Sequence, residues 1–291
     1  LLLHGFGGSR ADFLALAEPF AAAGWVLLAA DLPFHGARAP EGLESGAGFL
    51  SAHPASLRDN LVAAALDQVQ VLRFASSPAG LASLLPGVTL DTGGVAVVGE
   101  SLGGLVAAIL AGIDPAVETL ALAGAGGHLA RILAETPDPA LAATLQEALA
   151  ARGLTAGTPE AARFLEEVQM LLDRGDPVNY AAEYGLREPP PRLLLVTAGD
   201  GTGDGTIPAG AALELACAAR GDGQPWTFHV EGSCGGDPQG ACHGFLLHPE
   251  TAPAAAAAAT EAILAFFAAG GLPDPDAGLS PADALDCPDG T

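Results

Sequence analysis

The stretch VAVVGESLGG, residues 95–104, places a serine between two glycines directly after an apolar run. Gly99, Ser101 and Gly103 form the pattern G-x-S-x-G, in which small residues permit a turn tight enough to hold the serine hydroxyl in the open. The N–H groups at the start of a following helix would point toward negative charge that develops beside the serine. This stretch therefore predicts a nucleophilic serine on a strand–turn–helix.

A serine hydroxyl is a weak nucleophile, so it needs a general base and an acid that orients the base. In this kind of turn the chain order is serine, then acid, then histidine. Of the seven histidines, His243 and His248 follow the last expected strand. We expect His243, in the Gly-flanked stretch GACHGFLL, to be the base, and His248 to be a cap or surface residue.

The loop AGDGTGDGTIP, residues 198–208, lies between the serine and the histidine and is open to three interpretations. Its glycines could cradle a phosphate, Asp200 and Asp204 could ligate calcium, or one aspartate could be the acid. Two carboxylates would repel a phosphate, and the loop lacks the bidentate Glu that closes a hand-like calcium loop. We therefore expect one of the two aspartates to be the acid.

Two backbone N–H groups are expected to stabilise an oxyanion. The turn HGFGGS, residues 4–9, follows the first apolar stretch, and a His-Gly-x turn supplies the N–H of Phe6. The second donor is the N–H of Leu102, the residue after the serine. His4 itself is expected to make structural hydrogen bonds. Asp31 precedes the serine and follows a strand, so we expect a structural role for it too.

The cysteines offer a competing nucleophile. GACHG, residues 240–244, is the cysteine version of the serine motif, but no strand precedes it. We therefore expect Cys242 to pair with Cys234 or to be an inert thiol. The spacing of all four cysteines, which include Cys217 and Cys287, matches no zinc site. Disulfides would indicate an oxidising compartment.

Apolar strands that alternate with helices are expected to position these residues. Residues 1–3 are expected to be the end of a strand, and further strands are expected over residues 25–31, 93–100, 117–127, 191–200 and 225–232. The helices are expected over residues 11–23, 56–76, 102–111 and 251–269. Strands that are apolar throughout predict an α/β protein with a mostly parallel sheet and helices on both faces.

One segment breaks this alternation. Residues 127–185 have helical stretches at 141–152 and 159–174 and no expected strand, so we expect a helical lid or cap over one end of the sheet. The predicted organisation is a first core part (1–126), the cap (127–185), a second core part (186–270) and a loosely ordered tail (271–291). No signal peptide is visible, and the sequence opens on a strand end, so we expect upstream residues to be missing.

The composition excludes several partners. The 291 residues contain 34 Asp and Glu against 11 basic residues, all of them Arg, which gives a net charge of −23. Such a surface resists aggregation and does not suit a nucleic-acid backbone. Although 50% of the residues are hydrophobic, no apolar run approaches the ~18 residues that would span a bilayer. We expect a soluble globular protein without a transmembrane segment.

Taken together, six segments resemble the α/β-hydrolase family, and more narrowly the bacterial extracellular lipases and esterases related to virulence-factor lipases. They are HGFGGSRADF, AADLPFHG, LRDNLVAAALDQVQVLR, VVGESLGG, GDGTIP and HGFLLHP. GDGTIP matches the D-x-x-[VI]-P pattern of hydrolase acids, which favours Asp204 over Asp200. The resemblance implies a Ser101–Asp204–His243 triad with an oxyanion hole at Phe6 and Leu102.

The resemblance also implies hydrolysis of a small-molecule or lipid carboxylic ester, without a cofactor or metal, in a secreted, cell-surface or periplasmic protein. Two features depart from the pattern: the usual first strands of the sheet are absent, and Glu100 stands where lipases commonly have His. Acyl transfer or amide hydrolysis on the same triad, a non-catalytic binding module and a calcium-binding surface protein are the alternatives.

Overall fold

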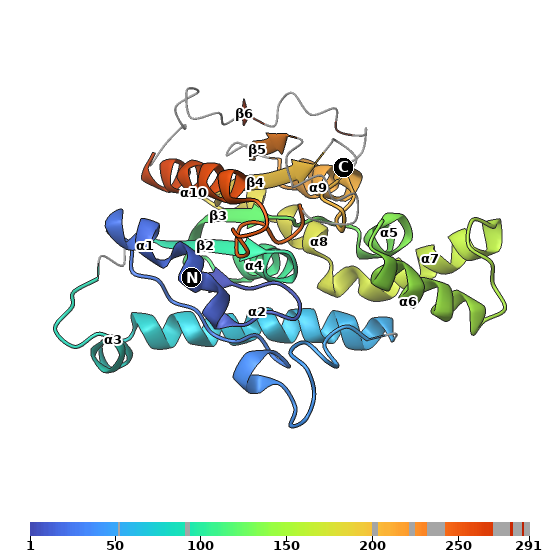
Figure 1. Ribbon diagram of the computed structural model, residues 1–291, viewed down its shortest axis with the longest axis horizontal. Coiled ribbons are helices and arrows are strands. Elements are labelled where there is room, and N and C mark those ends of the chain that lie inside the picture. The colour runs from blue at the N-terminus through green and yellow to red at the C-terminus, as the bar shows by residue number, and fades with distance from the viewer. Residues whose placement is uncertain are drawn as a thin grey trace.

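The fold is described from a computed structural model, which covers residues 1–51, 53–90, 94–199, 203–220, 225–231, 242–269, 280–281 and 287. Its centre is a twisted sheet with helices in front of and behind it (Figure 1). No helix in these ranges is both long enough and apolar enough to cross a membrane.

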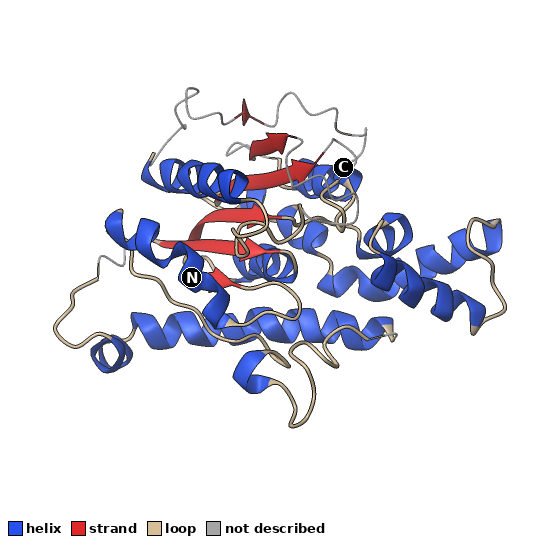
Figure 2. Cartoon of the chain, in the orientation of Figure 1, coloured by secondary structure: helices blue, strands red, loops and turns tan. Residues whose placement is uncertain are grey.

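The sheet has the strand order β1-β2-β3-β4-β5-β6 over the described residues. Strands β1 to β5 are parallel, and β6 pairs antiparallel with β5 (Figure 2). The predicted α/β class with a mostly parallel sheet is confirmed. The strands are β1 (Leu2–Leu3), β2 (Val95–Glu100), β3 (Val117–Ala123), β4 (Arg192–Gly199), β5 (Trp226–Glu231) and β6 (Ser280–Pro281).

Successive side chains of a strand point to opposite faces, and here both faces are buried. Val97 and Leu120 belong to the core on one face of the sheet, whereas Val98 and Ala121 belong to the core on the other. This explains why the strands are apolar at every position rather than at every second one. The first core contains α2 (Pro54–Ser76), α4 (Leu102–Ile113) and α9 (Ala209–Ala218), and the second contains α1 (Leu14–Ala22) and α10 (Pro253–Ala268).

The helices begin and end close to the predicted positions. The expected helix over residues 11–23 begins as a 3₁₀ turn (Arg10–Phe13), which Ser9 caps, and continues as α1. Two helices were not expected from the sequence: α3 (Pro78–Leu84) and α9, which links β4 to β5. Helix α9 has only ten residues, several of them small, so its pattern is easily read as part of a loop.

The expected strand over residues 25–31 is wrong. The segment lies beside β1, but it makes a single parallel bridge, Leu2 to Ala29, and one nearby hydrogen bond, Leu2 N–H to the Leu28 carbonyl at 2.9 Å. Because β1 has only two residues, it offers few groups for a ladder. Val26 is 44% exposed, so the apolar run is extended but is not a buried strand.

Residues 127–185, all of which the structure describes, form helices and turns without a strand. They contain α5 (Leu129–Glu135), α6 (Pro139–Ala150), α7 (Pro159–Leu172) and α8 (Pro177–Ala181). Helices α5, α6 and α7 lie together beside the sheet in Figure 1. The lid role and the division into four parts stay predictions. Short 3₁₀ turns at Gly36–Arg38, Asp173–Gly175 and Tyr184–Leu186 complete the described helical elements.

The buried carboxylate of Asp176 joins these helices. It accepts hydrogen bonds from the N–H groups of His128 (3.1 Å) and Leu129 (2.7 Å) at the start of α5. It also accepts from Val178 N–H at the start of α8 (3.1 Å) and from Gln169 Nε2 on α7 (2.8 Å). One side chain therefore satisfies donors from three helices, as buried helix ends require.

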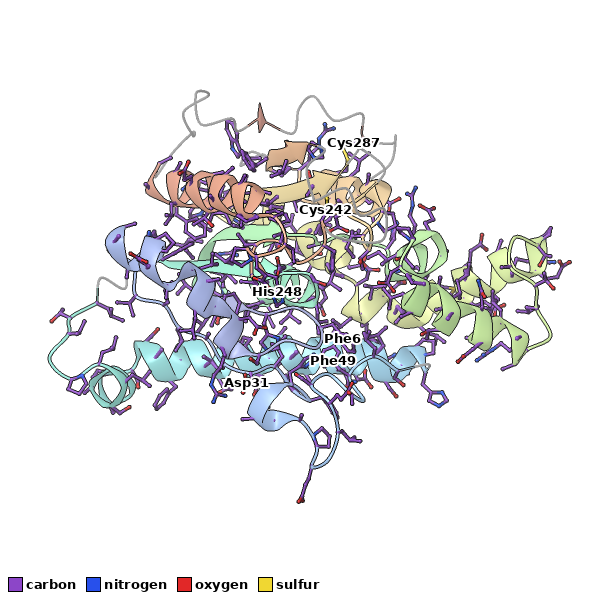
Figure 3. All side chains as sticks on the ribbon, viewed as in Figure 1. Phe6, Asp31, Phe49, Cys242, His248 and Cys287 are labelled. Atoms are coloured by element: carbon purple, nitrogen blue, oxygen red, sulfur yellow. A yellow bond between two sulfur atoms is a disulfide. The ribbon has the colours of Figure 1, made fainter. Side chains whose placement is uncertain are left out.

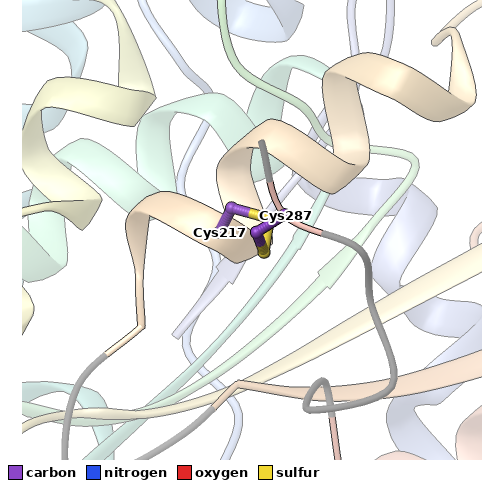
Figure 4. Close-up of a disulfide and its surroundings, with 2 residues drawn as sticks. All are labelled: Cys217 and Cys287. Atoms are coloured by element: carbon purple, nitrogen blue, oxygen red, sulfur yellow. A yellow bond between two sulfur atoms is a disulfide. The ribbon is translucent and has the colours of Figure 1, made fainter. Parts of the chain in front are cut away.

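A disulfide joins Cys217, at the end of α9, to Cys287 in the tail, with 5.7 Å between the Cα atoms (Figure 4). The disulfide attaches the described part of the tail to α9, and β6 attaches it to β5 at the edge of the sheet. Neither attachment was expected from the sequence. Cys234, the partner suggested for Cys242, lies outside the described residues.

Candidate active site

Ser101 is the turn between β2 and α4, and its backbone is in the left-handed region, with φ 53° and ψ −121°. The glycines of the motif make this turn possible. A Cβ on Gly99 would lie 2.5 Å from the Gly103 carbonyl oxygen, and one on Gly103 would lie 1.9 Å from the Leu3 carbonyl oxygen. The G-x-S-x-G spacing is thus a packing requirement of a strained strand-to-helix turn.

Three side chains meet at this turn in a hydrogen-bonded chain. The Ser101 Oγ lies 2.7 Å from His243 Nε2, and the Asp204 Oδ2 lies 2.8 Å from His243 Nδ1. Because the carboxylate only accepts, Nδ1 carries the proton that it donates to Asp204, and Nε2 accepts from the serine hydroxyl. The structure therefore brings together the three residues that the sequence analysis singled out, in the arrangement that a general base requires.

The loop after β4 holds the Asp204 carboxylate in place. Its second oxygen, Oδ1, accepts hydrogen bonds from Thr206 N–H (3.0 Å) and Ile207 N–H (2.7 Å). Burial favours the neutral acid, but the charge and hydrogen bond of His243 and these two N–H groups outweigh it and lower the pKa of Asp204. Asp204 is therefore ionised at neutral pH. Asp200, the alternative acid, lies outside the described residues.

His243 lies in a turn between β5 and α10. Burial disfavours the imidazolium, but the charge and hydrogen bond of Asp204 and the charges of Glu100 and Asp138 raise the pKa of His243 above its usual 6.5. His248, the rejected base, is half-exposed and lies 3.4 Å from Glu250, so it is a surface residue as expected.

Two backbone N–H groups that border the serine turn are the candidates for an oxyanion hole. Within the described part of the chain, neither the N–H of Phe6 nor that of Leu102 has a hydrogen-bond partner. Leu102 is the first residue of α4, where N–H groups have no helical acceptor. The turn before Phe6 reaches the serine, because a Cβ on Gly5 would lie 3.4 Å from Ser101 Cβ.

The Phe6 side chain stands at the surface of the site. Its ring is 49% exposed and packs edge-on against His35, with ring centroids 5.8 Å apart. His35 in turn packs against Phe49, with ring centroids 5.4 Å apart. Both phenylalanines are labelled in Figure 3. The loop of residues 39–51 therefore forms part of the wall around the turn.

His4 and Asp31 have structural roles, as expected. His4 Nε2 accepts from Leu32 N–H (3.0 Å), so its Nδ1–H donates to the Gly5 carbonyl (2.9 Å). Burial lowers the pKa of His4 and keeps it neutral. Asp31 accepts from the N–H groups of Arg10 (2.8 Å) and Ala37 (2.9 Å) and from the Arg10 side chain. It thereby joins the 3₁₀ turn that begins at Arg10 to the loop that contains Ala37.

The structure also bears on the competing interpretations. Cys242 is disulfide-bonded, so it has no thiolate to act as a nucleophile. Within the residues described, no three His, Cys, Asp or Glu side chains are grouped so that they could hold a metal ion. Asp204, one of the two suggested calcium ligands, has its carboxylate engaged by His243 and the loop N–H groups.

Thr136, in the helical segment of residues 127–185, contacts the loop that carries Asp204. Thr136, which follows α5, donates its hydroxyl to the Thr206 carbonyl at 2.7 Å, and Thr206 N–H in turn donates to Asp204. Asp138, the cap of α6, contributes charge at His243. The junction of α5 and α6 is therefore next to the hydrogen-bonded chain.

A further contact of the site was not expected from the sequence. Glu100, the residue before the serine, is 3% exposed and accepts from Leu246 N–H at 3.0 Å and Leu247 N–H at 3.4 Å. The sequence offered only one signal, an acid at the end of an apolar strand. Nothing in the sequence indicates that its partners lie 146 and 147 residues away.

Comparisons with known proteins agree with this fold. Residues 1–192 match the family described as alpha/beta hydrolase fold. A thermostable carboxyl esterase from Bacillus coagulans is similar over 91% of this chain and 87% of its own, with a TM-score of 0.53 and 14% identity. A lipase in its open form is similar over 90% of this chain and 89% of its own, with a TM-score of 0.50 and 18% identity. At these identities the likeness shows the fold alone. No curated protein sequence matches the chain.

Proposed function

Because the chain belongs to the alpha/beta hydrolase fold family, we propose that it is a serine carboxylic-ester hydrolase with Ser101, His243 and Asp204 as its catalytic triad. The observation that carries the proposal is the hydrogen-bonded chain from Ser101 Oγ through His243 to Asp204, with distances of 2.7 and 2.8 Å. The likeness to the carboxyl esterase and the lipase described above supports the ester class.

In the first half of the reaction, Ser101 Oγ attacks the ester carbonyl carbon while His243 Nε2 takes the hydroxyl proton. Asp204 stabilises the imidazolium that forms, because its carboxylate is ionised and its position is fixed. The N–H groups of Phe6 and Leu102 bind the oxyanion, and donors of this kind contribute about 3–4 kcal/mol each. His243 then gives the proton to the leaving alcohol, and the acyl group stays on Ser101.

In the second half, water replaces the alcohol. His243 Nε2 takes a proton from the water as it attacks the acyl carbon, and the same two N–H groups stabilise the second oxyanion. Collapse of this intermediate returns the proton to Ser101 and releases the carboxylic acid. All the groups required are on this chain, so the proposal needs no cofactor or metal.

The substrate in this proposal is a small-molecule or lipid ester, and residues 127–185 act as a cap over the site. Contact between Thr136 and the acid loop supports the cap. We place the protein in a secreted, cell-surface or periplasmic setting. The disulfide between Cys217 and Cys287 supports this, because such bonds persist in oxidising compartments.

Covalent labelling with a fluorophosphonate probe tests the assignment. The wild type should be labelled, and Ser101→Ala should not be, because the probe traps the activated serine. Hydrolysis of p-nitrophenyl esters of graded chain length then measures the acyl preference. Labelling that survives in Ser101→Ala, or a wild type that neither reacts with the probe nor hydrolyses any ester, would contradict the proposal.

A further inference from the structure

A buried carboxyl group that the mechanism above does not use lies next to the nucleophile. Glu100 is the last residue of β2, and its side chain turns to the loop that carries His243 rather than to solvent. Two N–H groups of that loop, those of Leu246 and Leu247, donate to its Oε1. A buried backbone donor that loses its acceptor destabilises the fold, so these contacts constrain the loop.

The same loop is also held by apolar packing. Phe245, Leu246 and Leu247 are buried in the core beneath α1 and α10. Apolar packing fixes the depth of the loop, but it is not directional. The hydrogen bonds to Glu100 supply the direction and thus the register of His243 relative to Ser101.

We propose that Glu100 is a positioning residue, whose carboxylate holds the His243 loop against the nucleophile strand and places a second negative charge beside the imidazole. This inference rests on the proposed function, because a general base must be held to within fractions of an ångström of the hydroxyl that it deprotonates. Asp204 orients the imidazole from its Nδ1 side, and Glu100 fixes the backbone that carries it.

The charges around Glu100 and His243 make the effect of Glu100 on the pKa of His243 measurable. Burial raises the pKa of Glu100 to about 7, although the charge of His243, the two N–H groups and the charge of His248 oppose the rise. His243 is faced by Asp204, Glu100 and Asp138, all acidic. Ionised Glu100 thus favours the imidazolium, and its removal should lower the pKa of His243.

Two variants separate the effect of the Glu100 charge from that of its hydrogen bonds to the His243 loop. Glu100→Gln keeps a carbonyl oxygen that can accept from Leu246 and Leu247 but removes the charge. We expect the titration midpoint of His243 to move to lower pH, and the acid limb of kcat/KM to move with it. Glu100→Ala removes both functions. We expect faster amide hydrogen exchange at residues 246 and 247 and a fall in kcat of roughly 10- to 100-fold with little change in KM.

The midpoint of His243 is measured by NMR, with the signal assigned from a His243→Phe spectrum. Asp176→Asn is the matched control, because it neutralises a buried carboxylate that also accepts backbone N–H bonds but is not among the charges that act on His243. It should destabilise the fold and leave the His243 midpoint unchanged.

An unchanged titration midpoint of His243 in Glu100→Gln would overturn the role of the Glu100 charge. Unchanged amide hydrogen exchange at residues 246 and 247 in Glu100→Ala would overturn the role of Glu100 in holding the loop. If Glu100→Ala does not fold, the Gln variant still decides. If the wild type hydrolyses no ester, the proposed function fails, whereas the NMR titration and the exchange rates still test Glu100.

Discussion

Two carboxylates, those of Asp204 and Glu100, act on the imidazole of His243, and their surroundings shift their pKa values in opposite directions. Asp204 accepts from His243 and from two loop N–H groups at 2.7 and 3.0 Å, which keeps its pKa low. Glu100 has contacts at 3.0 and 3.4 Å and is buried, which raises its pKa to about 7. One is therefore a permanent negative charge, and the other titrates near neutral pH.

The choice of acid can be tested directly. Asp204→Asn should lower kcat by about 10⁴-fold, because an amide at this position favours the imidazole tautomer whose Nε2 is protonated and cannot accept the serine proton. Asp200→Asn is the matched comparison and should retain activity close to that of the wild type. Steady-state hydrolysis of a p-nitrophenyl ester measures both. The reverse order of effects would move the acid to Asp200.

Glu100 also predicts how stability depends on pH. Its pKa in the folded protein, about 7, is above the ordinary 4.5, so its contribution is fully present below pH 4.5 and is lost as pH rises through 7. The difference corresponds to about 3 kcal/mol. Relative to the wild type, Glu100→Gln should therefore gain stability as the pH rises from 4.5 to 8.

Urea unfolding of both proteins at several pH values measures this difference. A stability difference that stays constant over that pH range would show that Glu100 does not titrate as described. Ionisation of Glu100 would then leave the free energy of unfolding unchanged.

Among the individual site residues, the sequence predicted those that a local pattern identifies. Ser101 follows from its glycines, and His243 follows from chain order and its Gly-flanked position. The acid was ambiguous because Asp200 and Asp204 both lie in one Gly-rich turn, and only the family pattern distinguishes them. The contact of Glu100 with residues 246 and 247 was unpredictable, because a lone acid at a strand end carries no record of a distant N–H partner.

Among the elements, burial explains both the success and the error of the sequence analysis. Strands β2, β3 and β4 are buried on both faces, so their unbroken apolar runs predict them. Residues 25–31 have the same kind of run, yet they have only the two residues of β1 as a partner. An apolar run shows that a segment is extended or buried, but it does not show whether a neighbouring strand is long enough to pair with it.

The Asp176 contacts make a prediction about the helical segment. Asp176→Ala should lower the free energy of unfolding by about 2–4 kcal/mol, because it leaves buried N–H groups of α5 and α8 without an acceptor. Urea unfolding gives the loss, and hydrogen exchange should locate it at residues 128–136 and 177–181.

Asp138→Ala is the control for this experiment. Asp138 caps α6 through Ala140 and Leu141, at 2.9 Å each, but it is only partly buried, so its loss should cost about 1 kcal/mol. Equal losses in the two variants would show that Asp176 is an ordinary cap rather than the junction of three helices.

For the molecule as a whole, the net charge of −23 disfavours a compact state through self-repulsion. The disulfide between Cys217 and Cys287, which are 70 residues apart, acts in the opposite direction. The sequence could not predict this pair, because four cysteines allow three connectivities and the choice depends on which chain ends meet in space.

Cys217→Ser/Cys287→Ser should lower the free energy of unfolding by about 4 kcal/mol, the chain-entropy value for a loop of this length. Thermal or urea unfolding measures the loss. Because Cys242 is also disulfide-bonded, the double variant, rather than a reducing agent, isolates this bond. A variant as stable as the wild type would show that this disulfide adds nothing to the stability of the fold.

The same disulfide also divides the proposed triad topologically. Residues 217–287 form a covalently closed ring, and His243 lies on it, whereas Ser101 and Asp204 lie on the open part of the chain before it. A protease that cuts once inside the ring therefore cannot release the base from the other two residues. Such a nicked protein would migrate as a single species on a non-reducing gel and as two fragments after reduction, and the ring would keep its active site within one molecule.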